Sequence, residues 1–327
     1  MNRIPLLLAP VAKDYLWGGS RLNDDFSFEC PVSPFAEAWV CATHPEGSSQ
    51  VTALSCTLSE LLARHPGLLG TNALRITGGA ATLPILIKLI DARQDLSVQV
   101  HPDDAYALAH EGEPGKTEMW YVLDARPGTE LIYGFKIDIT AETFRRMIAE
   151  GRIGELLNHV PVHKNDVYMV NPGTVHAIGA GALVAEIQQN SNITYRLYDY
   201  DRVGKDGRKR TLHIDRALEV ADLRSSSSPR QPMRLLRYRA GCASELLMRC
   251  RYFQVERLLL NTETCRRLVA FKTQENSFHA LLCVDGCGSI VWEGGGINFF
   301  KGDCVFVPAE SVPLLLHGKA QLLNVSC

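Results

Sequence analysis

The sequence lacks long hydrophobic runs, a strong excess of charge and closely spaced cysteine pairs. Its apolar stretches, such as residues 84–87 before Lys88, are far shorter than the roughly 20 residues that a membrane-spanning helix needs. The net charge is −2, from 34 Lys and Arg against 36 Asp and Glu, so no basic field indicates nucleic acid. Hydrophobic residues make up 46% of the 327 positions, which is typical of a globular protein. We therefore expect neither a membrane nor a nucleic-acid partner.

The ten cysteines do not form the pattern of a disulfide framework. None is part of a Cys-x-x-Cys pair, and the closest approach in the sequence is Cys283 with Cys287. The N-terminal apolar run ends at Pro10 before any small-residue cleavage site, so we expect no secretory signal. A chain of this size without such a signal is predicted to keep its thiols reduced in the cytoplasm.

Residues 224–232 divide the chain. This segment reads Arg-Ser-Ser-Ser-Ser-Pro-Arg-Gln-Pro, which is polar, flanked by proline and unable to bury a core, and so predicts a linker. We expect a catalytic domain with helical decoration over residues 1–223 and a smaller, non-catalytic β domain over residues 233–327.

Short β-strands are predicted for most of the remaining sequence. In residues 96–101, apolar positions alternate with Ser97, Gln99 and His101, so these three polar side chains share one face of a strand. Similar β-rich runs occupy residues 120–123, 130–135, 166–170, 182–187, 194–200, 278–284, 302–308 and 321–325. Many short strands with turn residues between them predict an antiparallel sandwich or barrel.

Two helices are predicted from their N-terminal caps. Residues 57–60, Thr-Leu-Ser-Glu, fit a capping box. Thr140 is expected to cap a second helix, with Phe144 and Met147 on one stripe and Gly151 at the end. The predicted fold is therefore mainly β, with a larger barrel carrying a few helices and a second, smaller C-terminal β-barrel.

Four residues suggest a metal site. Gln99 and His101 lie two apart on one predicted strand, Glu118 follows after a loop, and His176 lies much later. Either histidine alone would fit an ordinary barrel histidine held by hydrogen bonds. Together the four side chains offer two nitrogens and two oxygens, which suits a divalent ion such as zinc and leaves room for water or a substrate oxygen.

The order of these residues resembles the two motifs of the cupin superfamily. In that superfamily a strand carries His-x-His with a later Glu, and a Pro-Gly-x-x-His turn supplies the last histidine. Here Gln99 replaces the first histidine, and residues 172–176 match the second motif. The change from His to Gln resembles the type I phosphomannose isomerases in their short bacterial form. Further segments similar to that family are residues 15–19, 37–39, 84–90, 96–103, 115–121 and 193–199, so the resemblance covers about residues 1–220.

The resemblance implies a zinc-dependent cupin enzyme of carbohydrate metabolism. Such an enzyme interconverts mannose 6-phosphate and fructose 6-phosphate, an aldose and a ketose, through an enediol. The implied ligands of one Zn²⁺ per chain are Gln99, His101, Glu118 and His176. The expected partner is a small sugar phosphate, and the expected state is a monomer or a weak homodimer.

The resemblance also implies that Lys88, Lys116, Glu186 and Arg196 surround the metal. We expect Glu186 to be the catalytic base, Lys116 to assist it, and Arg196 to hold the charge of the transition state. Lys88 is expected to face the substrate, although a buried lysine can also form a structural salt bridge. It stays open whether Lys88 or Arg196 meets the phosphate.

Two of the predicted site residues, Trp17 and Arg196, each have a second interpretation. Trp17 is expected to line the pocket entrance, and a place in the hydrophobic core fits its sequence context equally well. For Arg196 the alternative is an ion pair with Asp199, Asp201 or Glu186.

Three rival functions also stay open: a related sugar-phosphate isomerase or epimerase, an Fe(II) cupin oxygenase, and a non-catalytic sugar-binding protein. Residues 202–210 are basic, and Asp206-Gly207 indicates a hairpin whose charges are solvated, with a role in attracting sugar phosphates as the alternative. His279 and His317 lie in neither cupin motif. The second barrel is therefore expected to serve packing and stability.

Overall fold

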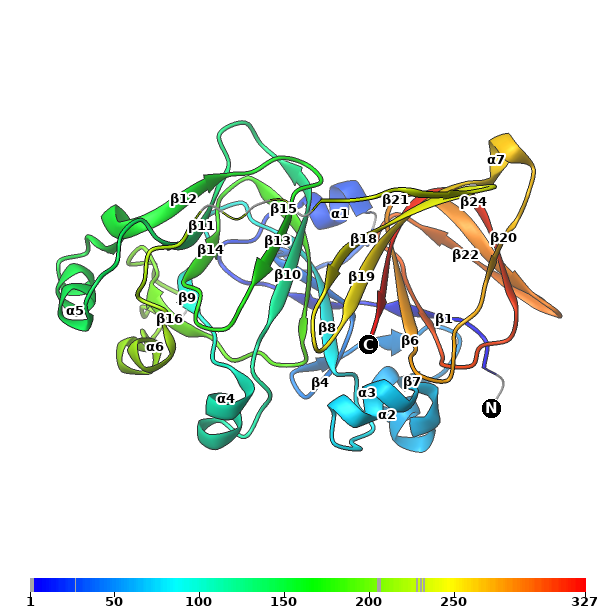
Figure 1. Ribbon diagram of the computed structural model, residues 1–327, viewed down its shortest axis with the longest axis horizontal. Helices are drawn as coiled ribbons and strands as arrows, with labels where there is room; N and C mark the ends of the chain where they lie inside the picture. Colours follow the sequence, from blue (N-terminus) through cyan, green and yellow to red (C-terminus); the bar gives the residue numbers. More distant parts are fainter. Residues whose placement is uncertain (1–2, 27, 205–206, 228, 230, 232) are drawn as a thin grey trace.

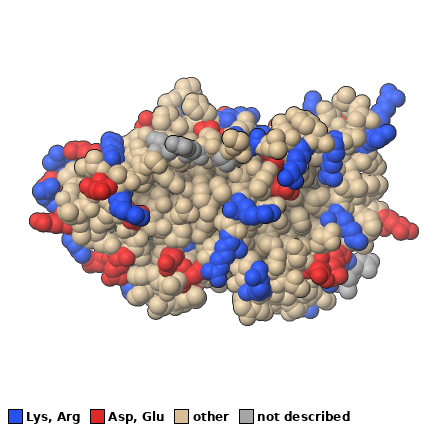
Figure 2. Space-filling view, in the orientation of Figure 1, with Lys and Arg blue, Asp and Glu red and all other residues tan. Residues whose placement is uncertain are grey.

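The computed structural model describes residues 3–26, 28–204, 207–227, 229, 231 and 233–327. Two lobes made mainly of β-strands lie side by side, with the short helices at the periphery (Figure 1). On the face shown in Figure 2, basic side chains lie in small separate groups among acidic and uncharged residues. No helix of the described residues has the length and apolar character to cross a bilayer.

The first lobe is a sandwich of two antiparallel sheets. The six-stranded sheet runs β13 (Val167–Val170), β10 (Glu118–Ala125), β15 (Ala182–Gln189), β8 (Ile85–Asp91), β3 (Glu37–Cys41) and β2 (Val11–Lys13). The five-stranded sheet runs β12 (Leu157–Pro161), β11 (Glu130–Phe135), β14 (His176–Ile178), β9 (Val98–Val100) and β16 (Tyr195–Tyr198). Between them, Ile90 and Trp120 of one sheet share a core cluster with Leu131 and Ile178 of the other. The prediction of a mainly β, cupin-like fold is confirmed.

The middle strands of the six-stranded sheet are buried on both faces. All seven residues of β8 are buried, and their side chains alternate between the faces. Ile87 and Leu89 share a core cluster with Val255 of the second lobe. Lys88 and Ile90 point the opposite way, into the interior of the first lobe. The alternation of β8 therefore places a lysine inside the sandwich.

The second lobe is formed by a sheet of eleven strands that includes the start of the chain. Its order is β17 (Arg237–Arg239), β18 (Cys242–Arg249), β19 (Gln254–Asn261), β24 (Leu314–Ser326), β21 (His279–Trp292), β23 (Cys304–Val307), β1 (Leu6–Ala9), β6 (Gln50–Val51) and β7 (Cys56–Thr57). In addition, β20 (Val269–Phe271) pairs with β24, and β22 (Gly295–Phe300) with β21. Strand β1 pairs antiparallel with β23, with Leu6 opposite Phe306 and Leu8 opposite Cys304. Residues near the N-terminus thus complete a sheet made mostly from the last third of the chain.

The domain division at residues 224–232 stays a prediction. Within that segment, residues 228, 230 and 232 lie outside the described residues. The pairing of β1 with β23 adds that a strand from before the predicted boundary belongs to the sheet of the second lobe.

Both predicted helices are confirmed. Helix α2 (Leu58–Arg64) has the complete capping box, in which Thr57 accepts from the Glu60 amide and Glu60 accepts from the Thr57 amide. Helix α5 (Ala141–Ala149) is capped by Thr140, and Gly151 follows it with a φ of 68°. Further helices that the sequence did not predict are α1 (Arg21–Phe26), α3 (Thr71–Ile76), α4 (Asp104–His110), α6 (Ile214–Val220) and α7 (Thr262–Cys265). None exceeds seven residues, too short for a helical period to be visible.

Every β-rich run named from the sequence overlaps a strand, and the differences lie at the strand ends. The strand predicted over residues 96–101 is shorter in the structure, where β9 spans Val98–Val100. His101 therefore lies just past its end. Two smaller strands, β4 (Thr43–His44) and β5 (Gly47–Ser48), form a separate hairpin.

Candidate metal centre and its cavity

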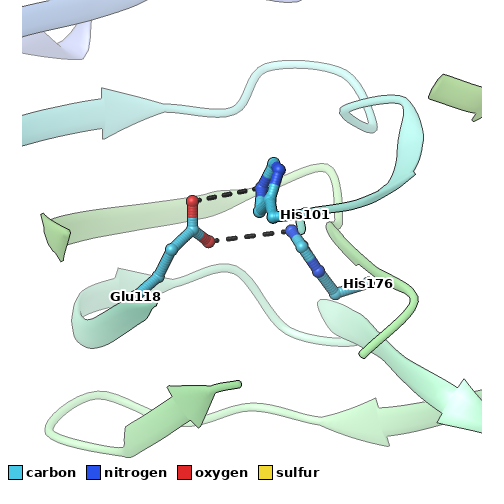
Figure 3. Close-up of side chains that lie close together, drawn as sticks. All are labelled: His101, Glu118 and His176. Carbon is cyan, nitrogen blue, oxygen red and sulfur yellow. Dashed lines mark ion pairs between the residues drawn. The ribbon is translucent and has the colours of Figure 1, made fainter. Parts of the chain in front are cut away.

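Three metal-ligating side chains from both sheets of the first lobe meet in its interior. Glu118 is the first residue of β10, His176 is the first residue of β14, and His101 follows β9. Glu118 Oε1 lies 3.2 Å from His101 Nε2, and Glu118 Oε2 lies 3.6 Å from His176 Nε2 (Figure 3). One ligand atom from each residue lies within 4.8 Å of the others, and all three residues are buried.

The hydrogen bonding of this cluster fits a bound cation. Oε2 of Glu118 and Nε2 of His176 are buried without a hydrogen-bond partner among the described residues, while Oε1 of Glu118 forms an ion pair with Lys116 at 2.9 Å. His176 Nδ1 lies 2.8 Å from the carbonyl oxygen of Thr174, so this nitrogen donates and Nε2 keeps a free lone pair. Metal-ligating histidines are commonly oriented by such a bond from the other ring nitrogen. The donor set therefore suits a divalent ion.

Burial sets the protonation of the three residues. Burial, followed by the charge of Lys116, lowers the pKa of His101 to about 3. Burial likewise lowers the pKa of His176. Burial would raise the pKa of Glu118, but Lys116 and His101 hold that pKa well below its usual value. Two neutral imidazoles and one carboxylate are the forms in which these side chains bind metals.

Gln99, the fourth predicted ligand, lies beside the cluster. On β9 it is the antiparallel partner of His176 on one side and of Arg196 on the other. It lines the cavity described next. Its role as a ligand stays a prediction.

A cavity of about 320 Å³ opens beside the cluster. The predicted site residues that line it are Trp17, Lys88, Gln99, Lys116, Glu186 and Arg196. Lys116 connects the cavity to the cluster, because its Nζ lies 2.9 Å from Glu118 Oε1 and 3.3 Å from His101 Nε2. The structure thus brings together all nine residues that the sequence proposed for the site. Trp17 also belongs to the hydrophobic core, so both interpretations of this residue apply.

A row of charged and aromatic side chains crosses the six-stranded sheet at the cavity wall. Trp39, Lys88, Glu186 and Trp120 are successive partners on β3, β8, β15 and β10. Lys88 Nζ lies 3.2 Å from Glu186 Oε2 and 3.6 Å from Glu37 Oε2. Trp120 Nε1 donates to Glu186 Oε1 at 2.9 Å. Lys88 therefore forms a buried salt bridge and also lines the cavity.

These contacts shift the pKa of both groups in the row. Burial would lower the pKa of Lys88, but Glu37 and Glu186 outweigh it and the pKa is raised. Burial, and then the charge of Glu118, raises the pKa of Glu186. A carboxyl group whose pKa is raised toward neutral pH can both accept and return a proton.

Arg196 reaches the cavity without a carboxylate partner among the described residues. Its Nε donates to Ser97 Oγ at 3.3 Å and its guanidinium donates to the Thr211 carbonyl at 3.0 Å. Each carboxylate proposed as its partner pairs with another cation: Asp199 with Arg202 and Arg210, Asp201 with Lys209, and Glu186 with Lys88. Burial, followed by repulsion from Arg210, lowers the pKa of Arg196 to about 10. The guanidinium is thus available to an anionic ligand.

Two charged cavity residues were missed by sequence reasoning. Glu37 pairs with Lys88 and was noted only as part of a family segment. Arg210 lines the cavity and bonds to Asp199 at 2.7 Å, so the expectation that the charges of residues 202–210 are solvated is wrong for this residue. The available clue was Asp199, because a carboxylate in an alternating strand needs a cation. Lys205 and Asp206, in the predicted hairpin, lie outside the described residues.

Comparisons with known proteins find relatives over nearly the whole chain. Residues 6–121 match the family described as phosphomannose isomerase type I, catalytic domain, and residues 244–327 match the mannose-6-phosphate isomerase cupin domain. The chain is 37% identical to mannose-6-phosphate isomerase ManA of Bacillus subtilis over 99% of both chains. It is 44% identical to the mannose-6-phosphate isomerase of Streptococcus mutans over 66% of this chain and 67% of that protein.

Two solved structures share the fold. A crystal structure of the mannose 6-phosphate isomerase from Bacillus subtilis superposes with a TM-score of 0.88, at 33% identity and over 99% of each chain. A zinc-bound mannose 6-phosphate isomerase superposes with a TM-score of 0.76 over 98% of each chain, at 16% identity, which shows likeness of fold alone.

Proposed function

The chain belongs to the type I phosphomannose isomerase family, and from this premise we propose that it interconverts mannose 6-phosphate and fructose 6-phosphate. The observation that carries the proposal is the cavity itself. A cluster fit for a divalent ion, a proton-accepting carboxyl and an unpaired guanidinium all lie at one opening of about 320 Å³. These are the groups that an aldose–ketose isomerisation of a phosphorylated sugar requires.

We propose that Gln99, His101, Glu118 and His176 hold one Zn²⁺ per chain. Two imidazoles and a carboxylate whose ligand atoms converge support zinc, which favours nitrogen and oxygen donors in a four-ligand site. When bound, such an ion polarises oxygens next to the C–H bond that breaks.

Glu186 is proposed to move the proton. Its carboxylate takes the proton from C2 of the aldose as the carbonyl oxygen gains a proton, which gives an enediol. It then returns a proton to C1 as the C2 hydroxyl loses its own, which gives the ketose. Lys88 and Trp120, at 3.2 and 2.9 Å, hold the two carboxylate oxygens in one orientation.

Lys116 and Arg196 are proposed to stabilise negative charge on the substrate. Lys116 lies between the metal-binding cluster and the cavity, close to where charge develops on the reacting oxygens. Arg196, with Arg210 near it, presents a fork of donors suited to an anionic oxygen. Lys88 and Trp17 are proposed to contact the sugar.

The setting of the enzyme is also a proposal. All ten cysteines are free, which supports the reducing conditions of the cytoplasm. A monomer or weak homodimer is expected, and sedimentation of the purified protein at several concentrations tests it.

The decisive experiment measures the interconversion of the two sugar phosphates and the zinc content of the same sample, before and after chelation. We expect activity that disappears with the metal and returns with added zinc. Bound metal without turnover would redirect the search to other sugar-phosphate isomerisations or epimerisations. A product formed only with oxygen would indicate an oxygenase. Neither metal nor turnover would favour a sugar-binding protein.

A further inference from the structure

The turn between β18 and β19 of the second lobe bonds to the first lobe. Tyr252 in this turn donates its hydroxyl to Asp104 Oδ2 at 2.6 Å, across 148 positions of sequence. Burial, followed by this bond, raises the pKa of Tyr252 to about 12, so the hydroxyl stays protonated. Asp104 is the first residue of α4, three positions after His101.

The other oxygen of Asp104 is bonded to the segment that carries Lys116. Asp104 Oδ1 accepts from the Gly115 amide at 2.9 Å and from Gln189 Nε2 at 2.8 Å. Gln189 Oε1 in turn accepts from the Thr117 amide at 2.9 Å, and the Gln189 amide donates to the Thr117 carbonyl at 3.1 Å. The backbone is thus held on both sides of Lys116.

Close packing confines the same segment. A Cβ on Gly115 would lie 2.5 Å from the backbone of Asp103 and Asp104, so only glycine allows this approach. The Lys116 amide donates to the Pro102 carbonyl at 3.1 Å. Because the backbone is fixed in this way, the Lys116 ammonium has a defined path to Glu118 and His101.

We propose that Tyr252 and Asp104 are positioning residues, through which the second lobe fixes the backbone around Lys116 and so the placement of its ammonium for the reaction. The proposal rests on the proposed function for its kinetic consequence. The hydroxyl of Tyr252 is not needed to join the lobes, since a continuous hydrophobic cluster that includes Ile87, Leu89 and Val255 already does so. The hydrogen bond of the hydroxyl instead fixes the orientation of the segment that carries Lys116. Displacement of a catalytic group by about 1 Å can lower a rate about 100-fold.

The test compares Tyr252→Phe with Tyr238→Phe, an exposed tyrosine of the second lobe. For Tyr252→Phe we expect kcat to fall about 10-fold with KM little changed, as for partners that orient a catalytic group. Amide hydrogen exchange in a peptide spanning residues 112–118 should become faster, with the melting temperature nearly unchanged. Tyr238→Phe should match the wild type in all three measurements.

A second variant tests whether the two residues act as one unit. Asp104→Ala should lower kcat more than Tyr252→Phe, and the double variant should be no slower than Asp104→Ala alone. Fully additive losses, or unchanged kcat and exchange in Tyr252→Phe, would overturn the proposal. If the wild type does not isomerise the sugar phosphates, the proposed function fails. The exchange of residues 112–118 then still decides whether Tyr252 fixes this segment.

Discussion

The two lobes are both built from antiparallel strands, but their interiors hold different side chains. Inside the first lobe, Lys88, Glu118 and Glu186 are buried on the inner face of the six-stranded sheet. The corresponding cluster of the second lobe is made of apolar side chains such as Leu281 and Phe299. Burying charge costs desolvation free energy even where the groups are paired, so the interior of the first lobe carries a cost in stability that this apolar cluster of the second lobe does not. We therefore expect the first lobe to supply the chemistry and the second to support it.

The histidines of the two lobes show the same contrast. In the first lobe, Nε2 of His176 is buried without a hydrogen-bond partner among the described residues. In the second lobe, His279 bonds to Asn324 at 2.7 Å and His317 bonds to Thr262 at 2.8 Å. Each of these three histidines has one partner at Nδ1, but among the described residues only the histidines of the first lobe converge with a carboxylate in a group that could hold a metal ion. The histidines therefore provide the sharpest way to test the comparison.

The largest effect is expected for His101→Ala. Removing one imidazole from a four-ligand site should abolish zinc binding and lower kcat more than about 100-fold, beyond the usual loss for an outer-shell partner. Metal analysis and kinetics on the same preparation measure both. The matched control is His317→Ala in the second lobe, which should keep metal and activity. A His101→Ala enzyme that is active without metal would reject the ligand assignment.

Glu186→Gln should have the next largest effect. The amide keeps the shape but cannot accept a proton, so kcat should fall about 10²- to 10⁴-fold with the metal retained. Glu130→Gln, at an exposed carboxylate on β11, is the control. Wild-type turnover in the Glu186 variant would assign the proton transfer to another group.

The wild-type pH profile follows from the direction of the Glu186 shift. Because burial and Glu118 raise its pKa above the ordinary 4.5, the reactive carboxylate forms only as the pH rises through that higher value. The acid limb of kcat should therefore lie at higher pH than for an ordinary glutamate. The same shift affects stability: the folded state binds the proton more tightly, so the free energy of unfolding falls as the pH rises from the ordinary value of 4.5 through the raised pKa of Glu186. An acid limb at or below pH 4.5 would contradict this assignment.

A smaller kinetic effect is expected for Arg196→Ala. Among the described residues the guanidinium bonds to Ser97 and Thr211 and not to the three residues of the cluster, so zinc should stay bound while kcat falls about 10²-fold. Arg145→Ala, on the exposed surface of α5, is the control. A rise in KM with kcat unchanged would instead assign Arg196 to holding the phosphate in the ground state. Unchanged kinetics would give it a structural role.

The sequence predicted those parts of the site that lie close together along the chain, and it missed some contacts between residues that are distant in sequence. Gln99 and His101 lie two positions apart on one strand, and residues 172–176 form one short turn. Each of these two segments could therefore be recognised as a sequence motif. The structure brings His101 and His176 together with Glu118 as expected, and Gln99 lines the cavity beside them. The partners of Lys88 were not predicted, because pairing with Glu37 depends on the register of β3 against β8.

The arrangement of the two lobes could not be predicted from the sequence, because it depends on pairing between strands that are distant in sequence. Alternation and caps predicted strands such as β11 and the helices α2 and α5. Nothing local to Leu6 or Leu8 indicates that β1 pairs with β23 nearly 300 positions later. Periodicity shows which face of a strand is buried but not which strand lies beside it. The role of Tyr252 depends on the same kind of distant contact.

The smallest effects are expected for the helix caps, and they test whether the lobes fold together. Thr140→Ala removes the cap of α5, whose Phe144 and Met147 pack in a cluster confined to the first lobe. Thr57→Ala removes the cap of α2, whose Leu58 belongs to the cluster shared by both lobes. Each loss should lower the free energy of unfolding by about 1 kcal/mol and leave kcat unchanged.

Calorimetry of the two cap variants then separates two modes of unfolding. Because the shared cluster and the pairing of β1 with β23 join the lobes, we expect one thermal transition that both variants shift by a similar few degrees. If the lobes unfold separately, Thr140→Ala would shift one transition and leave the other in place. That result would make the second lobe an independent unit, and its influence on Lys116 would then depend on local contacts such as Tyr252 with Asp104 rather than on common folding.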